Sequence, residues 1–219
     1  MKKVGVVLGG CGVQDGSEIH EAVSVLLALA RKGAQAVCLA PAGPQARVMN
    51  HAAGAPVEES RDMLVESARI ARGDIFTLAD AKVGELDAIV IPGGFGAALN
   101  LSNFANVGAD MEIHADLQPF LSAAYRAGKP ICALCIAPPI LAKLMQQEGV
   151  KGAKLTIGSD AGTAAAMEAL GQTHVAASAT EAVVDPDHKL VTGPAYMLAQ
   201  NVAELYEGID KAIDELLRL

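Results

Sequence analysis

The fold of this chain is decided by one stretch, which reads Pro130-Ile131-Cys132-Ala133-Leu134-Cys135-Ile136-Ala137-Pro138-Pro139. The apolar run before Cys135 predicts a strand buried inside a sheet. Proline is favoured in the first turn of a helix, so the prolines after Ala137 predict that a helix begins there. Cys135 is therefore expected on a tight turn between a buried strand and a helix.

Strands and helices alternate on both sides of this stretch. There is no internal repeat or linker, so residues 1–219 are predicted to form a single domain. Such alternation is typical of an α/β protein whose mostly parallel sheet is covered by helices on both faces. We expect strands at residues 3–8, 34–39, 88–91, 130–134, 153–157, 182–184 and 190–191, helices at 18–31, 60–71, 117–127, 137–144 and 198–217, and a short hairpin within 47–56.

The composition limits the classes of function and the cellular compartments that we expect for this protein. Hydrophobic residues make up 52% of the 219 residues, enough for a large core, and the net charge of −8 disfavours binding to nucleic acid. The apolar run at residues 4–8 is too short for a signal peptide, and no stretch is long enough to span a membrane. Four cysteines suggest a reducing compartment. We expect a cytoplasmic protein; a mitochondrial or plastid location after loss of a transit peptide is the alternative.

Cys135 has the surroundings of a reactive thiol. The active site of such a sheet lies at the carboxyl ends of its strands, where the loops at residues 9–17, 92–100 and 134–137 are all expected. The start of the next helix supplies a positive dipole and unpaired N–H groups, which favour the thiolate and can bind an oxyanion. From these residues alone, the alternative is a buried structural cysteine.

Two neighbouring loops supply candidate partners. Pro92-Gly93-Gly94 ends a buried strand, and Gly94 is a natural second N–H donor to an oxyanion; the alternative is a simple tight turn. Glu18 is expected to open a helix, where its carboxyl group can exchange a proton with a nearby thiol; the alternative is a glutamate favoured by the helix dipole. His20 and Glu21 are expected to point elsewhere, toward the rim of the site or a partner subunit.

Other motifs give weaker signals. Cys132 and Cys135 form a C-x-x-C pair, but Cys132 is expected in mid-strand and no second ligand pair completes a zinc site, so we interpret Cys132 as packing. The glycines after the first strand do not complete a dinucleotide fingerprint, because Asp15 stands where the third glycine belongs. A Cys–His pair would require a distant histidine to fold close to Cys135; the histidines are His20, His51, His114, His174 and His188.

Taken in chain order, these blocks resemble the ThiJ/PfpI group of class I glutamine-amidotransferase-like proteins. The resemblance is closest to the ElbB-type branch, named for enhanced lycopene biosynthesis. It spans nearly the whole chain and is carried by Gly10–Val13, Asp15–Ala22, Pro92–Ala98, Asn100–Ala105, Cys135–Pro138 and Pro194–Asn201.

The resemblance implies a flavodoxin-like three-layer sandwich, commonly a homodimer, that needs no metal or organic cofactor. Carried onto this chain, it makes Cys135 the nucleophile and Glu18 the general acid and base. Gly94 and Ile136 would donate N–H groups to the oxyanion. Further pocket residues are expected at Cys11, Gly93, Asn103 and Tyr196. The chain departs from the group in one respect: amidotransferases and many members place a histidine base near the cysteine, sometimes immediately after it, where this chain has Ile136.

ElbB-type proteins are described as glyoxalases that act without glutathione, and related members as protein deglycases. The resemblance therefore implies a cysteine-dependent conversion of glyoxal, or of a similar small aldehyde, into a hydroxy acid such as glycolate. A link to isoprenoid metabolism is implied by the name of the branch alone. Two rivals remain: a redox sensor that uses Cys135, with Cys11 as its resolving partner, and a degenerate amidotransferase subunit, which the missing histidine disfavours.

Overall fold

A seven-stranded sheet forms the centre of the molecule. The computed structural model describes residues 1–219 and gives the strand order β10-β11-β7-β6-β1-β2-β5, with only the β10–β11 pair antiparallel. The strands of this sheet are β1 (Lys3–Val7), β2 (Gln35–Ala40), β5 (Ile75–Thr77), β6 (Ala88–Ile91), β7 (Ile131–Leu134), β10 (Val183–Asp185) and β11 (Leu190–Gly193). The predicted mostly parallel, flavodoxin-like sheet is confirmed.

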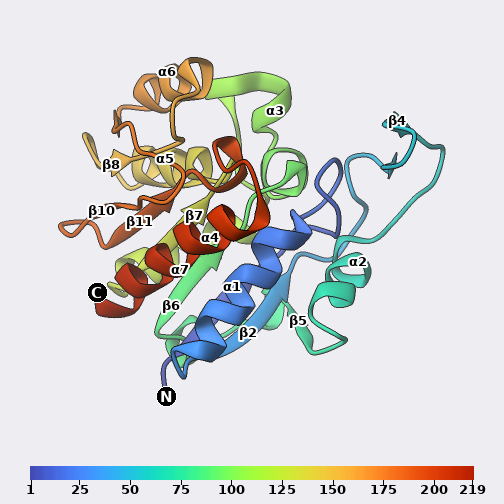
Figure 1. Cartoon of the computed structure of the whole chain (residues 1–219), viewed down its shortest axis with the longest axis horizontal. Helices are drawn as coiled ribbons and strands as arrows, with labels where there is room; N and C mark the ends of the chain where they lie inside the picture. The colour runs from blue at the N-terminus through green and yellow to red at the C-terminus, as the bar shows by residue number, and fades with distance from the viewer.

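Helices cover both faces of the sheet. Helices α1 and α7 lie side by side across one face, as Figure 1 shows, and pack on the inward side chains of β1, β6 and β7. Helices α4, α5 and α6 contribute to the core on the other face. The helices are α1 (Ile19–Arg31), α2 (Met63–Ile70), α3 (Phe104–Val107), α4 (Leu117–Arg126), α5 (Pro138–Gln147), α6 (Ala161–Ala169) and α7 (Val202–Arg218).

Side-chain caps set where several of these helices begin. Asp62 accepts a hydrogen bond from the Val65 N–H, and Asn201 accepts from the two N–H groups that follow Val202. An N-cap residue lies outside the helix, so α2 and α7 begin later than the residues 60 and 198 predicted from the hydrophobic pattern. No helix combines the length and the apolar character needed to cross a bilayer.

Some elements differ from the prediction. The hairpin within residues 47–56 is confirmed as β3 (Met49–Asn50) and β4 (Ala55–Pro56). The strand predicted at 153–157 shortens to β8 (Lys154–Leu155), which pairs with β9 (Thr173–His174) outside the main sheet. Edge strand β5, helix α3, strand β9 and helix α6 were not predicted. β5, α3 and β9 have four residues or fewer, and α6 is rich in alanine, so none of them carries a strong hydrophobic period.

Candidate active site

Cys135 lies on the predicted turn between β7 and α5. Its φ angle is 57°, in the left-handed region that a non-glycine residue enters at a cost of roughly 1–2 kcal/mol. The Cys135 N–H donates to the Gly193 carbonyl at 2.9 Å, which fixes the strained residue to the neighbouring strand. This is the geometry of a nucleophile elbow, in which backbone strain presents the reactive atom above the sheet.

The carboxyl group that meets the Cys135 sulfur belongs to Glu21. The two side chains are hydrogen-bonded, and the N–H groups of Gly94 and Ile136 also donate to the sulfur. Glu21 is completely buried, and its Oε2 accepts from the Gly93 N–H at 2.7 Å. Its Oε1 accepts from the Tyr196 N–H at 3.3 Å. Both carboxylate oxygens are therefore held in place by backbone donors.

This contact corrects two expectations: that Glu18 is the partner of the thiol, and that Glu21 points toward the rim of the site or a partner subunit. Glu18 is the N-cap of α1, and its Oε2 accepts from the Glu21 N–H at 2.7 Å. It reaches the pocket wall but has no hydrogen bond to Cys135. The physical reason is the point at which the helix begins: Glu21 lies one turn further along, on the side of α1 that faces the sheet.

Burial controls the ionisation of the pair. It raises the pKa of Glu21 from its ordinary value of 4.5 to about 7, with a further upward contribution from the nearby Glu18 carboxylate. Burial and the charge of Glu21 also raise the pKa of the Cys135 thiol well above its usual value. The expectation of a resting thiolate favoured by the helix dipole is thus corrected. Because the two side chains interact directly, they share their protons as a coupled pair, and the first proton lost belongs to the pair.

Two glycines let the backbone approach this pair. A Cβ at Gly93 would lie 2.8 Å from Glu21 Oε2 and 3.0 Å from Cys135 Sγ. Gly94 has a φ of 89°, and a Cβ there would collide with the backbone of Gly16 and Glu18. These positions require glycine because the strand end lies directly against the thiol and the start of α1.

A small pocket of about 300 Å³ opens above the sulfur. It brings Cys135, Glu18, Gly94, Ile136 and Tyr196 together, as the sequence predicts. Glu21 and Gly93 lie behind the sulfur. The apolar side chains in the wall, which the sequence did not single out, are Val13, Phe95 and Met197.

Tyr196 lines the pocket and directly follows a second residue with a strained backbone. Ala195 has a φ of 45°, and the Tyr196 hydroxyl is hydrogen-bonded to Nδ1 of His20 at 2.8 Å. His20 is exposed at the start of α1. The expectation that His20 lies near the rim of the site agrees with this placement.

Two predicted pocket residues lie elsewhere. Asn103 lines a separate depression, and its side-chain oxygen accepts from the Glu112 N–H at 2.7 Å, because the loop after β6 folds back on itself. Cys11 is absent from the pocket wall, and burial together with the Glu66 carboxylate raises the pKa of its thiol. Its surroundings are those of the loop beside α2, which gives no support to Cys11 as a resolving cysteine.

Cys132 is fully buried within β7, in agreement with its interpretation as packing, and burial raises the pKa of its thiol. All four cysteines are free thiols. No three histidine, cysteine or acidic side chains lie close enough together to form a metal site.

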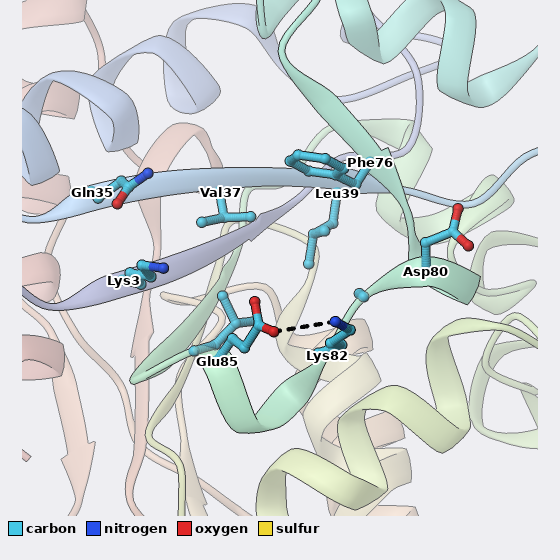
Figure 2. Close-up of a pocket in the computed structure, with 10 residues that line it drawn as sticks. Lys3, Gln35, Val37, Leu39, Phe76, Asp80, Lys82 and Glu85 are labelled. Carbon is cyan, nitrogen blue, oxygen red and sulfur yellow. Dashed lines mark ion pairs between the residues drawn. The ribbon is translucent and has the colours of Figure 1, made fainter.

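A second cavity, of about 340 Å³, runs along β2 from Gln35 at its amino end to Leu39 near its carboxyl end and reaches Phe76 of the edge strand β5 (Figure 2). Apolar side chains including Val37, Leu39 and Phe76 line it. Lys82 and Glu85 form an ion pair at its edge, with 3.4 Å between Nζ and Oε1. It holds no cysteine or histidine, so the chemistry of the Cys135 pocket has no counterpart there.

Curated relatives match almost the whole chain. The ES1 protein homolog, mitochondrial, of Rattus norvegicus is 43% identical over 99% of this chain and 84% of its own length. The human glutamine amidotransferase-like class 1 domain-containing protein 3, mitochondrial, is also 43% identical, over 99% of this chain and 83% of its own length. Both relatives are mitochondrial proteins. The expectation of a cytoplasmic location is therefore contradicted, and a reducing compartment inferred from cysteine content does not identify the cytoplasm.

Solved structures share the fold. An isoprenoid biosynthesis protein with amidotransferase-like domain from Ehrlichia chaffeensis superposes with a TM-score of 0.91 and 35% identity, over 99% of each chain. Glyoxalase III of Candida albicans superposes with a TM-score of 0.63 at 16% identity, over 98% of this chain and 97% of the enzyme. The second likeness shows a common fold alone.

The family follows from the agreement between site, fold and sequence. The model of the DJ-1/PfpI family matches residues 11–203, which include the glycine loops, the cysteine elbow and Tyr196. The chain belongs to the DJ-1/PfpI family.

Proposed function

We propose that this protein is a cofactor-independent glyoxalase that converts glyoxal, or a similarly small dicarbonyl, into a hydroxy acid. One observation carries the proposal. A buried thiol, Cys135, is hydrogen-bonded to a carboxyl group, Glu21, whose pKa is about 7, at the base of a pocket of about 300 Å³. A proton acceptor that titrates near neutral pH is suited to general acid–base chemistry.

The reaction begins with addition of sulfur to one aldehyde carbon. Ionised Glu21 takes the thiol proton while the S–C bond forms. The carbonyl oxygen becomes an oxyanion, which the Gly94 and Ile136 N–H groups stabilise. The oxyanion then takes up the proton held by Glu21, which gives a neutral hemithioacetal. Because both N–H groups already point at the sulfur, the oxygen bonded to the attacked carbon forms beside them.

Proton transfer within the hemithioacetal completes the isomerisation. Glu21 removes the hydrogen of the sulfur-bearing carbon as a proton, which leaves an enediolate with its negative charge on the former aldehyde oxygen. That oxygen takes the proton of the hydroxyl group on the sulfur-bearing carbon, and Glu21 returns its own proton to the neighbouring carbon. The product is a glycolic thioester of Cys135. Water then adds to the thioester, the S–C bond breaks, and the proton returns to sulfur. One water enters and one glycolate leaves, so the balance requires no external oxidant, reductant or metal.

The site favours this chemistry over its two rivals. A cysteine sensor needs an accessible thiol of low pKa, whereas Cys135 is 7% exposed and its pKa is raised by burial and by Glu21. Glutamine hydrolysis in amidotransferases relies on a histidine base, and the group bonded to this thiol is a carboxyl group. Aldehydes add to thiols without a strongly basic partner, so Glu21 meets their requirement.

The biological setting and the assembly are parts of the same proposal. Removal of dicarbonyls would serve glycation repair, or the isoprenoid biosynthesis named for the Ehrlichia relative. The homodimer that the family resemblance implies stays a prediction.

The test is consumption of glyoxal and appearance of glycolate, followed by NMR with the purified protein. We expect Cys135→Ala to abolish turnover. Cys132→Ala removes a fully buried sulfur from β7, three residues earlier, and should keep turnover within about threefold. Glycolate production at the wild-type rate by Cys135→Ala, or no turnover by the wild type, would reject the proposal.

A further inference from the structure

The Cys135 pocket has few polar groups with which to hold a substrate. Apart from Cys135, the wall contains only two polar side chains, Glu18 and Tyr196. A dicarbonyl has two oxygens, and the Gly94 and Ile136 N–H groups can take only the one on the carbon that sulfur attacks. The second oxygen loses its water when the molecule enters, so it needs a hydrogen-bond donor in the wall.

Glu18 is poorly suited to this task. An ionised carboxylate only accepts hydrogen bonds, as does a carbonyl oxygen. One of its oxygens is already engaged by the Glu21 N–H at the start of α1. Tyr196 is the remaining candidate, because a phenol donates through its O–H while its oxygen accepts from another group.

Two residues of α1 hold Tyr196, one through its backbone N–H and one through its hydroxyl group. Its N–H donates to Glu21 Oε1 at 3.3 Å, and its hydroxyl lies 2.8 Å from His20 Nδ1. The strained Ala195 immediately before it sets the direction of the chain. When His20 carries its proton on Nδ1, that N–H donates to the phenol oxygen, and the O–H of Tyr196 is free to point into the pocket.

We propose that Tyr196 is a specificity residue that donates a hydrogen bond to the second oxygen of a dicarbonyl, and that His20 is its positioning residue. The inference rests on the proposed function and adds what that function lacks, a reason for the pocket to prefer dicarbonyls over simple aldehydes. A monoaldehyde offers no second oxygen and gains nothing from Tyr196.

The experiment uses two aldehydes and two readouts. Reversible addition of an aldehyde to Cys135 protects the thiol from alkylation by iodoacetamide, so the protecting concentration reports binding without turnover. In Tyr196→Phe we expect glyoxal to protect about tenfold less well, as befits one lost hydrogen bond of about 1.4 kcal/mol. Protection by acetaldehyde should be unchanged. In turnover, the change should appear mainly as a higher KM for glyoxal.

His20 is tested by rescue. His20→Ala removes the partner of the phenol and should weaken protection by glyoxal severalfold. His20→Asn retains a polar group near the position of Nδ1 and should restore most of it. The chain offers a matched control in a second tyrosine–histidine pair, Tyr125 and His188, whose hydroxyl-to-Nδ1 distance is 3.1 Å. This pair lies toward the amino end of β7, so Tyr125→Phe should change neither readout.

The outcomes separate this inference from the proposed function. If Tyr196→Phe loses protection by both aldehydes equally, or by neither, Tyr196 does not select dicarbonyls and the inference is overturned. If the wild type shows tyrosine-dependent protection by glyoxal but forms no glycolate, the specificity assignment holds and the glyoxalase proposal fails. Thermal melting of each variant shows whether a loss reflects unfolding.

Discussion

Two cavities of similar volume lie against the same sheet, and they differ in the chemical groups that line them. The cavity of Figure 2 runs along β2 and the edge strand β5, and charged side chains such as Lys82 and Glu85 pair at its edge. The Cys135 pocket lies at the carboxyl ends, where strand ends meet the beginnings of helices and N–H groups converge on the sulfur. Volume therefore does not identify the reactive site, whereas strand direction does.

The two cavities also differ in the surroundings of their glutamate side chains. Glu85 pairs with Lys82, and both side chains are more than half exposed. Glu21 faces a thiol and has no cation, so burial raises its pKa. Substitutions in one cavity or the other test whether this difference in chemistry persists.

The largest effect is expected from Glu21→Gln. It removes the proton acceptor of Cys135, and loss of a general base typically lowers the rate by 10²–10⁴-fold. In the wild type, kcat/KM should rise with pH through about 7 as the pair loses its first proton, and in Glu21→Gln this rise should move to higher pH. Stopped assays across pH 5–9 measure both changes. Glu18→Gln is the comparison. Because the Glu18 charge raises the pKa of Glu21, this change should lower the midpoint, by no more than about half a pH unit, and an equal loss of rate in both variants would return the role to Glu18.

The second prediction concerns stability. The folded-state pKa of Glu21, about 7, exceeds its ordinary 4.5, so the folded protein binds this proton more tightly than the unfolded chain. This contribution is fully present below pH 4.5 and is lost as the pH rises to about 7, roughly 3 kcal/mol in total. Urea unfolding of wild type and Glu21→Gln at pH 5 and 8 should show the difference. A pH dependence that is the same in both proteins would mean that Glu21 titrates normally.

The third prediction places a methyl group beneath the thiol. Gly93→Ala would set a Cβ against Cys135 Sγ and Glu21 Oε2, and overpacking of this kind costs about 1–3 kcal/mol. We expect a lower unfolding midpoint in urea together with slower alkylation of Cys135. Gly84→Ala is the control, because a Cβ there meets no atom within 4 Å. Unchanged alkylation in a folded Gly93→Ala protein would contradict the close packing of this site.

The smallest effect is expected at the cavity of Figure 2. Lys82→Ala breaks an ion pair whose partners are both well exposed, and such pairs contribute at most about 1 kcal/mol. Glyoxal turnover should stay at the wild-type value, and the urea midpoint should shift only slightly. A substantial loss of turnover would show that the two cavities are coupled.

Much of the fold could be predicted from the sequence because its signals are local. The apolar run before Cys135 and the prolines after it define the elbow, and alternating strands and helices give the parallel sheet. Elements with weak periodicity, β5 and α6, were missed. The family resemblance places Cys135, Gly94, Ile136 and Tyr196 in one site, and the structure brings all four together.

The identity of the carboxyl partner could not be predicted in the same way. In a helix each residue turns by about 100°, so a small change in where α1 begins changes which glutamate faces the sheet. Glu18 and Glu21 have the spacing of an N-cap and the third helical residue, and that signal, if used, would have favoured Glu21 as the residue inside the helix. Asn103 depends on the path of a loop, which no periodic pattern encodes.

The left-handed backbone at Cys135 has a consequence for how such a chain can change over time. Its φ of 57° is comfortable for glycine and strained for cysteine, so the reactive residue is maintained at the expense of fold stability. In a descendant that no longer uses the thiol, replacement of Cys135 by glycine would relieve the backbone strain and leave the surrounding sheet intact. The backbone conformation at residue 135 therefore favours a substitution that abolishes the activity.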